Sequence, residues 1–309
     1  MSDDLTPDYN PGDLLDQVLA KKDDELIPWQ SITLPSKGHY YDGQIPNGVV
    51  KIKPMGLYAD KVLATSRLIK TGQAMDYIFK HCVRMPNDFD PLDLLSDDRV
   101  FLLYILRGVT HGNDYEFILN CPSCDNHSQH EYDLNELWET RQEPPVDSND
   151  LPLQEPFKIV LPYLSQQVGD DFWVTVRFLR GRDTMDFLGT VSHDAGLPGK
   201  ARNRKNRGKK PVYDPIGETS ENVDEALENN INRVIVSAMG VEDRDKIGKL
   251  VEKMHSEDIG TISEWLRLNS PGIDTSIETD CPHCKAVINA PLPITESFFR
   301  PKKRRGSRE

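Results

Sequence analysis

The chain has 309 residues, which is enough for about two domains with cores of their own. With 37% hydrophobic residues, 28% charged residues and a formal net charge of −13, its composition is close to that of ordinary globular proteins, if somewhat polar. No stretch approaches the ~18 consecutive apolar residues of a membrane span, and the N-terminus lacks the regions of a signal peptide, so we expect a soluble protein made in a cytoplasm.

Residues 1–30 are polar and acidic and are predicted to form an N-terminal arm. Within this arm, the 3.6-residue spacing of four apolar residues predicts a short amphipathic helix suited to docking on a partner. These residues are Leu14, Leu15, Val18 and Leu19.

Residues 31–140 are predicted to form an N-terminal α+β domain. Its first part is extended and interrupted by proline and glycine, and residues 49–52 are predicted to form a strand. Apolar spacing then predicts two helices within residues 57–84 and a third helix after Pro91. The pattern changes to alternation near residue 115, which predicts a hairpin that contains the first pair of cysteines and ends near residue 132.

Residues 141–156 have the proline-rich and polar composition of a linker, and residues 157–275 are predicted to form an inserted α+β domain. In this domain we expect strands at 157–161 and 172–179 and a helix that begins near Asp183. Further helices are expected at 220–238, 247–254 and 259–266. Residues 276–299 are predicted to form a second cysteine-containing hairpin.

The net charge is unevenly distributed. Residues 200–210 carry seven basic residues and no acidic one, within a basic loop at 194–220. Residues 300–309 form a basic tail with six more basic residues. The rest of the chain has 24 basic and 49 acidic residues. The sequence therefore predicts an acidic body with two basic arms, and the loop is expected to be disordered unless a partner holds it.

Four of the five cysteines form two Cys-Pro-x-Cys pairs, and these are the most specific features of the sequence. Such pairs form knuckles that present two thiolates to a metal, and two knuckles supply the tetrahedral sulfur set that Zn²⁺ prefers. The sequence thus predicts a closed, structural zinc site with Cys121, Cys124, Cys281 and Cys284 as ligands. Because 156 residues separate the pairs, against ~15–20 in an ordinary ribbon, one ribbon must be split by an inserted domain.

Three other interpretations of these cysteines remain open at this point. They could be unrelated reduced cysteines in two turns, or redox pairs, although redox pairs are expected to open a helix and these pairs are flanked by predicted strands. Nearby histidines could also replace a ligand, namely His127, His130 and His283. The fifth cysteine, Cys82, is interpreted as a small core residue.

Signatures of catalysis are missing from the sequence. The phosphate-binding loop, the dinucleotide fingerprint, the nucleophile elbow and the metalloprotease helix motif do not occur. The acidic pairs Asp97 with Asp98 and Asp170 with Asp171 are typical of helix starts and solvated turns. We therefore expect a protein that is not an enzyme.

The basic arms have three interpretations. They could neutralise nucleic-acid phosphates, but neither arm interleaves aromatic residues and the acidic body would repel a polyanion. They could instead lie on acidic faces of neighbouring subunits, or remain solvated tails. Nucleic-acid binding is the least favoured of these.

Three separated stretches of the chain resemble one known family. The first comprises 34–41 (LPSKGHYY) and 50–55 (VKIKPM); the second comprises 98–103, Gly112, Tyr115 and the first cysteine pair; the third comprises 272–274, the second cysteine pair, 292–294 and 298–301. Together they resemble the baseplate hub subunits of T-even-type contractile-tailed bacteriophages. The resemblance covers residues 31–301 and is weakest at 194–220, which looks like an insertion.

The resemblance implies a structural component of the phage tail baseplate that assembles with other baseplate and tail subunits. Such a protein would be made in the host cytoplasm and then reside in the virion tail. The predicted fold is α+β, with a helical N-terminal region and an inserted α+β domain joined by a split four-cysteine zinc ribbon. Two rival functions are a non-virion assembly factor of the hub and a zinc-ribbon protein that binds nucleic acid.

Overall fold

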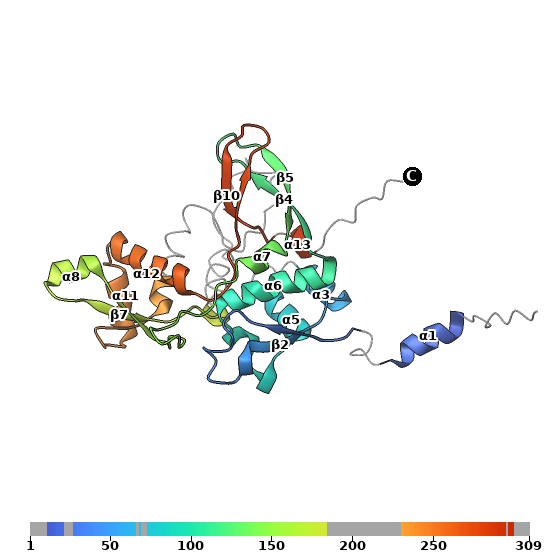
Figure 1. Cartoon of the computed structure of the whole chain (residues 1–309), viewed down its shortest axis with the longest axis horizontal. Helices are drawn as coiled ribbons and strands as arrows, with labels where there is room; N and C mark the ends of the chain where they lie inside the picture. Colours follow the sequence, from blue (N-terminus) through green and yellow to red (C-terminus); the bar gives the residue numbers. More distant parts are fainter. Residues whose placement is uncertain are drawn as a thin grey trace, which may run out of the picture.

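The computed structural model describes residues 11–21, 27–65, 68, 73–183, 230–294 and 296–299. These residues form a mixed α+β fold with small antiparallel sheets, which confirms the predicted fold class. Figure 1 shows an N-terminal body around helix α6, an inserted region to one side of it, and a stalk of two hairpins above it. The predicted basic loop at 194–220 and the basic tail at 300–309 lie outside the described residues.

The N-terminal body contains a three-stranded antiparallel sheet in the order β1-β2-β3. Ile32 pairs with Val50 and Ile52 pairs with Val83, so one face of the sheet is apolar and packs toward the core. The two helices predicted within 57–84 correspond to α3 and α5. The elements of the body are β1 (Gln30–Thr33), β2 (Val49–Ile52), α3 (Leu57–Leu63), α5 (Gln73–Cys82), β3 (Val83–Arg84) and α6 (Ser96–His111).

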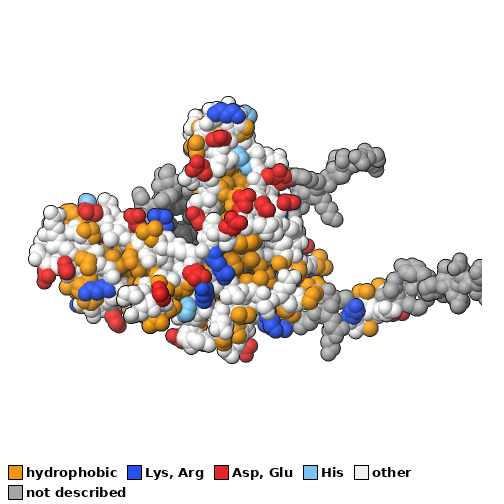
Figure 2. Space-filling model, in the orientation of Figure 1, with side chains coloured by type: hydrophobic (Ala, Val, Ile, Leu, Met, Phe, Trp, Pro, Cys, Tyr) orange, Lys and Arg blue, Asp and Glu red, His pale blue; other side chains and the backbone are white. Residues whose placement is uncertain are grey.

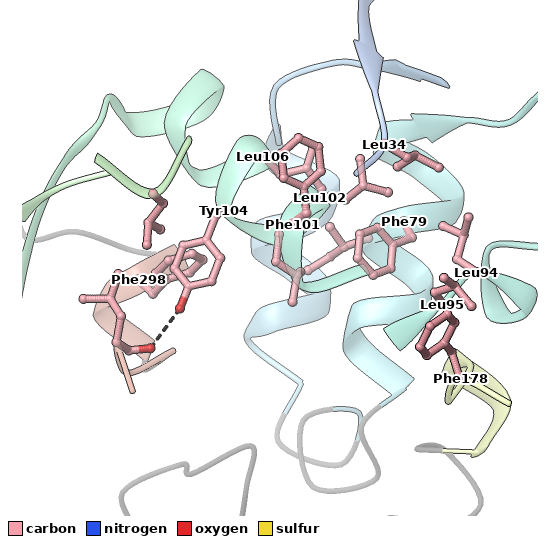
Figure 3. Packing of buried hydrophobic residues seen from close by; sticks show 14 of the residues in the cluster. Leu34, Phe79, Leu94, Leu95, Phe101, Leu102, Tyr104, Leu106, Phe178 and Phe298 are labelled. Atoms are coloured by element: carbon pink, nitrogen blue, oxygen red, sulfur yellow. Dashed lines mark hydrogen bonds between the residues drawn. The ribbon is translucent and has the colours of Figure 1, made fainter. Parts of the chain in front are cut away.

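Helix α6 forms the centre of the core. Its apolar residues are spaced so that most of its surface is buried, and they contact side chains from distant parts of the chain (Figure 3). Near its first turn lie Leu34 and Phe79 of the N-terminal body, and Phe298 from the C-terminal end packs against its Tyr104 with ring centroids 5.1 Å apart. The buried hydrophobic residues of the helix are Phe101, Leu102, Leu103, Tyr104 and Leu106.

The inserted region has its own three-stranded antiparallel sheet, in the order β6-β7-β8, and three helices. The first two strands, β6 and β7, lie within the ranges predicted as strands, 157–161 and 172–179. The region is joined to the body through Arg180, which pairs with Leu95 in a β-bridge and donates a hydrogen bond to the carbonyl of Tyr40 over 3.2 Å. Its elements are β6 (Phe157–Val160), α8 (Pro162–Val168), β7 (Trp173–Val176), β8 (Ile235–Ala238), α11 (Arg244–Val251) and α12 (Ser256–Asn269).

The helix predicted at 220–238 is wrong for its last four residues. Residues 230–234 are helical, but β8 (Ile235–Ala238) is a strand that pairs with β7. The spacing of Ile231, Val234 and Ile235 fits a helical face, yet Val234, Ile235 and Val236 are β-branched in succession, which favours a strand that can be buried on one side. Pairing with β7 therefore overrides the helical spacing.

The stalk consists of two antiparallel hairpins that lie side by side at the top of Figure 1. The first is formed by β4 (Asp114–Asn120) and β5 (His127–Asp133), and the second by β9 (Ser276–Asp280) and β10 (Val287–Pro291). Both hairpins were predicted. After β10 the chain returns to the body, where the short helix α13 (Glu296–Phe299) packs under β4, while α7 (Glu136–Glu139) follows the first hairpin.

The segment 34–41 forms a buried turn against the start of α6. The side chain of Ser36 donates to Asp98 over 2.5 Å, its backbone N–H donates to the same carboxylate over 3.2 Å, and the Tyr41 hydroxyl also donates to Asp98. Tyr41 in turn accepts the backbone N–H of Leu95 over 3.0 Å. All these groups are buried, so the family-like segment has a structural role: it fixes the first strand onto the central helix.

Gly38 in this turn should not tolerate a side chain. Its φ is +83°, and an added Cβ would lie 2.2 Å from the carbonyl oxygen of Ile45. We expect Gly38→Ala to lower the free energy of unfolding by about 2–4 kcal/mol, because left-handed strain adds to a backbone clash. Gly43→Ala is the matched control: φ there is +73° with nothing within 4 Å of the added atom, so about 1–2 kcal/mol of strain alone is expected. Equal losses in denaturant unfolding would contradict this.

Candidate metal centre

The two cysteine pairs occupy the turns of the two stalk hairpins and have the same backbone geometry. In the first turn, Cys121 donates its N–H to Asn126 over 3.0 Å and accepts the N–H of Asp125 over 2.9 Å. In the second, Cys281 donates to Ala286 and accepts from Lys285, each over 2.9 Å. Asp125 and Lys285 both have positive φ, 54° and 61°. The two turns are therefore equivalent knuckles, which the shared Cys-Pro-x-Cys pattern dictates.

The structure brings the four sulfur atoms together, although the pairs are 156 residues apart in sequence. The ligand atoms of Cys121, Cys124, Cys281 and Cys284 all lie within 4.8 Å of one another. Sγ of Cys121 is 3.5 Å from Sγ of Cys284, and Sγ of Cys124 is 3.8 Å from Sγ of Cys281. A tetrahedral ion with metal–sulfur bonds of ~2.3 Å separates its sulfur ligands by about 3.8 Å. The sulfur set thus fits a four-coordinate metal ion.

Backbone N–H groups favour the thiolate form of sulfurs in both knuckles. Burial raises the pKa of Cys121, but the N–H groups of Ser123 and Cys124 and the neighbouring thiols outweigh it and lower that pKa to about 6. The N–H of Cys284 lowers the pKa of Cys281 in the same way. The N–H of Ala286 also favours the thiolate of Cys284, but the adjacent sulfurs of Cys121 and Cys124 prevail and raise its pKa to about 12. The raised pKa of Cys284 shows the cost of a further negative charge among these sulfurs, which a bound cation would remove.

The knuckles differ in exposure. Cys121 and Cys281 are buried, Cys124 is half-buried and Cys284 is exposed. The side-chain amide of Asn126 donates to Sγ of Cys124 over 3.5 Å, which supports that ligand from the solvent side. The arrangement is closed, because four protein sulfurs leave no position for a substrate.

The histidines near the knuckles do not join the sulfur set. His127 and His283 are exposed, and His130 lies on β5 with both ring nitrogens engaged. Its Nε2 is 2.7 Å from the hydroxyl of Ser128 and its Nδ1 is 3.2 Å from the hydroxyl of Thr279 on β9. His130 therefore bridges the two hairpins below the sulfurs, a role that the sequence did not reveal.

The fifth cysteine and the acidic pairs have the surroundings expected of structural residues. Cys82 is fully buried at the end of α5, and burial raises its pKa to about 11. Asp97 and Asp98 occupy the first turn of α6, where Asp97 accepts from the Ser270 hydroxyl at the end of α12. Asp170 and Asp171 lie in the turn before β7.

A hollow of about 460 Å³ lies on the inserted region, and the charged side chains that line it are all engaged in ion pairs. Arg177 forms a bidentate ion pair with Asp183 at 2.8 Å, and Arg180 pairs with Glu155 at 2.8 Å. Arg182 pairs with Asp90 and Asp93 of the N-terminal body. The Arg182 pairs link the inserted region to the body, and because every charged side chain that lines the hollow is ion-paired, we assign no chemistry to it.

Comparison with known proteins identifies the family. The family model described as T4 bacteriophage base plate protein matches residues 30–300. The chain belongs to this family. No curated protein matches the chain, and no solved structure matches it either.

Membership of the T4 base plate protein family makes the chain a structural component of a phage baseplate, located in the virion baseplate and assembled with other baseplate proteins. The matched residues include both stalk hairpins, the buried turn at 34–41 and the inserted region on either side of residues 184–229. None of the helices in the described part of the chain is long and apolar enough to cross a bilayer.

Proposed function

We propose that the chain is a hub subunit of the baseplate and that a structural Zn²⁺ ion holds its two stalk hairpins together. The observation that carries the zinc site is the convergence of four sulfurs, within 4.8 Å, from two hairpins that are 156 residues apart in sequence and both lie within the family match. Zinc is the ion that a tetrahedral four-sulfur set most commonly holds in structural sites. When bound, it neutralises the thiolates and cross-links residues 121 and 284.

In this proposal the chain has a mechanical role and no catalytic one. The zinc ion cross-links the two stretches of chain on either side of the inserted region, so a force applied to that region does not separate the hairpins. The domain boundaries that we propose remain those of the sequence: a body at 31–140, a linker at 141–156, an inserted domain at 157–275 and a second knuckle at 276–299. The subunit would assemble in the host cytoplasm and stay in the tail.

Quantitative mass spectrometry of purified phage particles tests whether the subunit remains in the virion. A hub subunit should be recovered in a fixed ratio to the other baseplate proteins, whereas an assembly factor of the hub should be present in infected cells and missing from particles. Its absence from intact tails would refute the proposal. A gel-shift assay with DNA at rising salt examines the nucleic-acid alternative, which predicts binding that weakens steeply with salt.

A further inference from the structure

The short N-terminal helix lies apart from the rest of the protein with an apolar side uncovered. Helix α1 (Pro11–Ala20) confirms the short helix predicted for the arm, and it stands away from the body in Figure 1. Leu15, Val18 and Leu19, at helical spacing, have exposed fractions of 58%, 46% and 71%. Hydrophobic side chains are visible on this detached helix in Figure 2. Such a side is typical of a helix that docks on another surface.

The arm around this helix is strongly acidic. Residues 1–28 contain eight acidic residues and two lysines. Asp16 lies within the helix between the apolar positions Leu15 and Val18. A surface that accepts α1 should therefore combine apolar side chains with a rim of positive charge.

The N-terminal body carries a surface of this kind at its end nearest the arm. Three aromatic residues and three cations lie on it, and we call it the basic aromatic surface; it comprises Trp29, Lys53, Tyr58, Tyr77, Lys80 and Arg84. Tyr58 is 41% exposed and Tyr77 is 44% exposed, and neighbouring Leu57 is 70% exposed. Neither Lys53 nor Lys80 forms an ion pair with a described acidic residue.

Local contacts make these residues one continuous surface. The guanidinium of Arg84 and the ammonium of Lys53 lie 4.3 and 4.9 Å from the centre of the Trp29 ring. The backbone N–H of Lys53 donates to Cys82 over 2.9 Å, which places the β2 end beside the end of α5. On α5 itself, positions 77, 80 and 81 share one face, and the ring of Tyr58 on α3 lies 4.3 Å from His81.

We propose that the basic aromatic surface binds the acidic N-terminal arm of a second copy of this chain, with the apolar side of α1 packed on Tyr58, Tyr77 and Leu57. We choose the arm of a second copy as the binding partner because the arm is acidic, the surface is basic, and both expose apolar side chains at their centres. Nucleic acid suits the surface less well. Base stacking needs open ring faces, and those of Trp29 and Tyr58 already carry Arg84 with Lys53 and His81.

Sedimentation velocity of the full chain, over micromolar concentrations, tests the proposal. Wild-type protein should self-associate, with a dissociation constant that rises with salt. The Leu15→Ser, Leu19→Ser variant should raise that dissociation constant at least about tenfold, because it removes the apolar contacts of α1. The Lys53→Glu, Lys80→Glu variant should have an effect of the same size, because it reverses the charge of the surface that receives the arm. Lys246→Glu with Lys249→Glu on α11 is the matched charge control and should associate like wild type.

A charge swap distinguishes docking on a second copy from other outcomes. Asp13→Lys with Asp16→Lys should weaken association alone, and mixing this variant with the Lys53→Glu, Lys80→Glu variant should restore it. A wild-type chain that stays monomeric overturns the proposal, and so does loss of association without rescue in the mixture. The proposal also fails if the surface variant associates normally but no longer binds a single-stranded DNA oligonucleotide that the wild-type protein binds.

Discussion

Cys281→Ser is expected to reduce the bound zinc from about one ion per chain to less than about one tenth, because three thiolates hold a structural ion far more weakly than four. Apparent binding free energies of ~10–16 kcal/mol are typical of structural zinc in small domains, so the stalk should lose most of what holds its hairpins together. The hydrogen bond between His130 and Thr279 still links the two hairpins, and the hydroxyls of Tyr104 and Tyr115 still hold the chain after β10 at Leu292 and Pro293. The second hairpin, residues 276–291, should then become sensitive to proteolysis, while the buried end at Phe298 stays anchored.

Elemental analysis by mass spectrometry, with limited proteolysis of the same samples, measures both effects. Cys82→Ser is the matched control, since Cys82 is buried but lies outside the sulfur set. This variant should keep one zinc ion and an intact stalk, and its free energy of unfolding should fall by ~1–3 kcal/mol because a hydroxyl is buried. Recovery of stoichiometric zinc with Cys281→Ser would rule out the four-cysteine site, and recovery of a different metal would replace zinc while keeping the ligands.

The sulfur set was predictable from sequence because the chemistry is local to each pair. A Cys-Pro-x-Cys turn between two strands has one favoured knuckle geometry, so the ligand residues of each half follow from five or six residues of sequence. The zinc-site hypothesis required the two halves to meet, because two thiolates do not complete a tetrahedral shell, and the structure does bring the four sulfurs together. The bridge from His130 to Thr279 was not predictable, because it depends on the relative rotation of two hairpins that are not neighbours in sequence.

The fold was predictable where one periodicity dominates. The long run of apolar residues in α6 and the strict alternation in β4 predicted the right element types, because α6 is the buried central helix and β4 buries one face. The strand β8 was interpreted as helix because its apolar residues also fit a helical face, and only its pairing with β7 decides between the two. The short helices α7 and α8, with four and seven residues, are too short to show a period.

The buried network around Asp98 is the part of the fold with the weakest signal in the sequence. An aspartate at the start of a helix is usually a solvated residue that interacts with the helix dipole, and that was the interpretation of Asp97 with Asp98. In the structure Asp98 is fully buried and accepts three hydrogen bonds from a turn some sixty residues earlier. The distance in sequence hides the partners.

Asp98→Ala is expected to lower the free energy of unfolding by about 3–5 kcal/mol, because it leaves the hydroxyls of Ser36 and Tyr41 and the N–H of Ser36 buried without an acceptor. Asp98→Asn should lower the free energy of unfolding by only about 1–2 kcal/mol. The amide oxygen still accepts the backbone N–H of Ser36, and the Ser36 hydroxyl can rotate to accept a hydrogen bond from the amide. Denaturant unfolding of zinc-loaded protein measures both losses. Similar losses for the two variants would contradict a role in hydrogen bonding.

The pH dependence of the Asp98→Asn variant relative to wild type should show that the carboxyl group is buried. Burial raises the pKa of Asp98 to about 6 in the folded protein, against hydrogen bonds from Ser36 and Tyr41 that lower it, whereas the ordinary value is 3.8. Between these two values the folded protein binds the proton more tightly than the unfolded chain, so the contribution of Asp98 to stability is largest below pH 3.8 and falls as the pH rises toward 6.

A rise of the pKa from 3.8 to about 6 means that Asp98 contributes ~3 kcal/mol less to the free energy of unfolding above pH 6 than well below pH 3.8. Asparagine does not titrate, so the stability of wild type relative to Asp98→Asn should decline by about 2 kcal/mol between about pH 4 and pH 6.5 and then stay constant. A difference that is flat over this range would mean that the folded protein leaves the pKa of Asp98 at its ordinary value, and one that rises with pH would mean that the hydrogen bonds from Ser36 and Tyr41 outweigh burial and lower that pKa; either result would contradict the prediction.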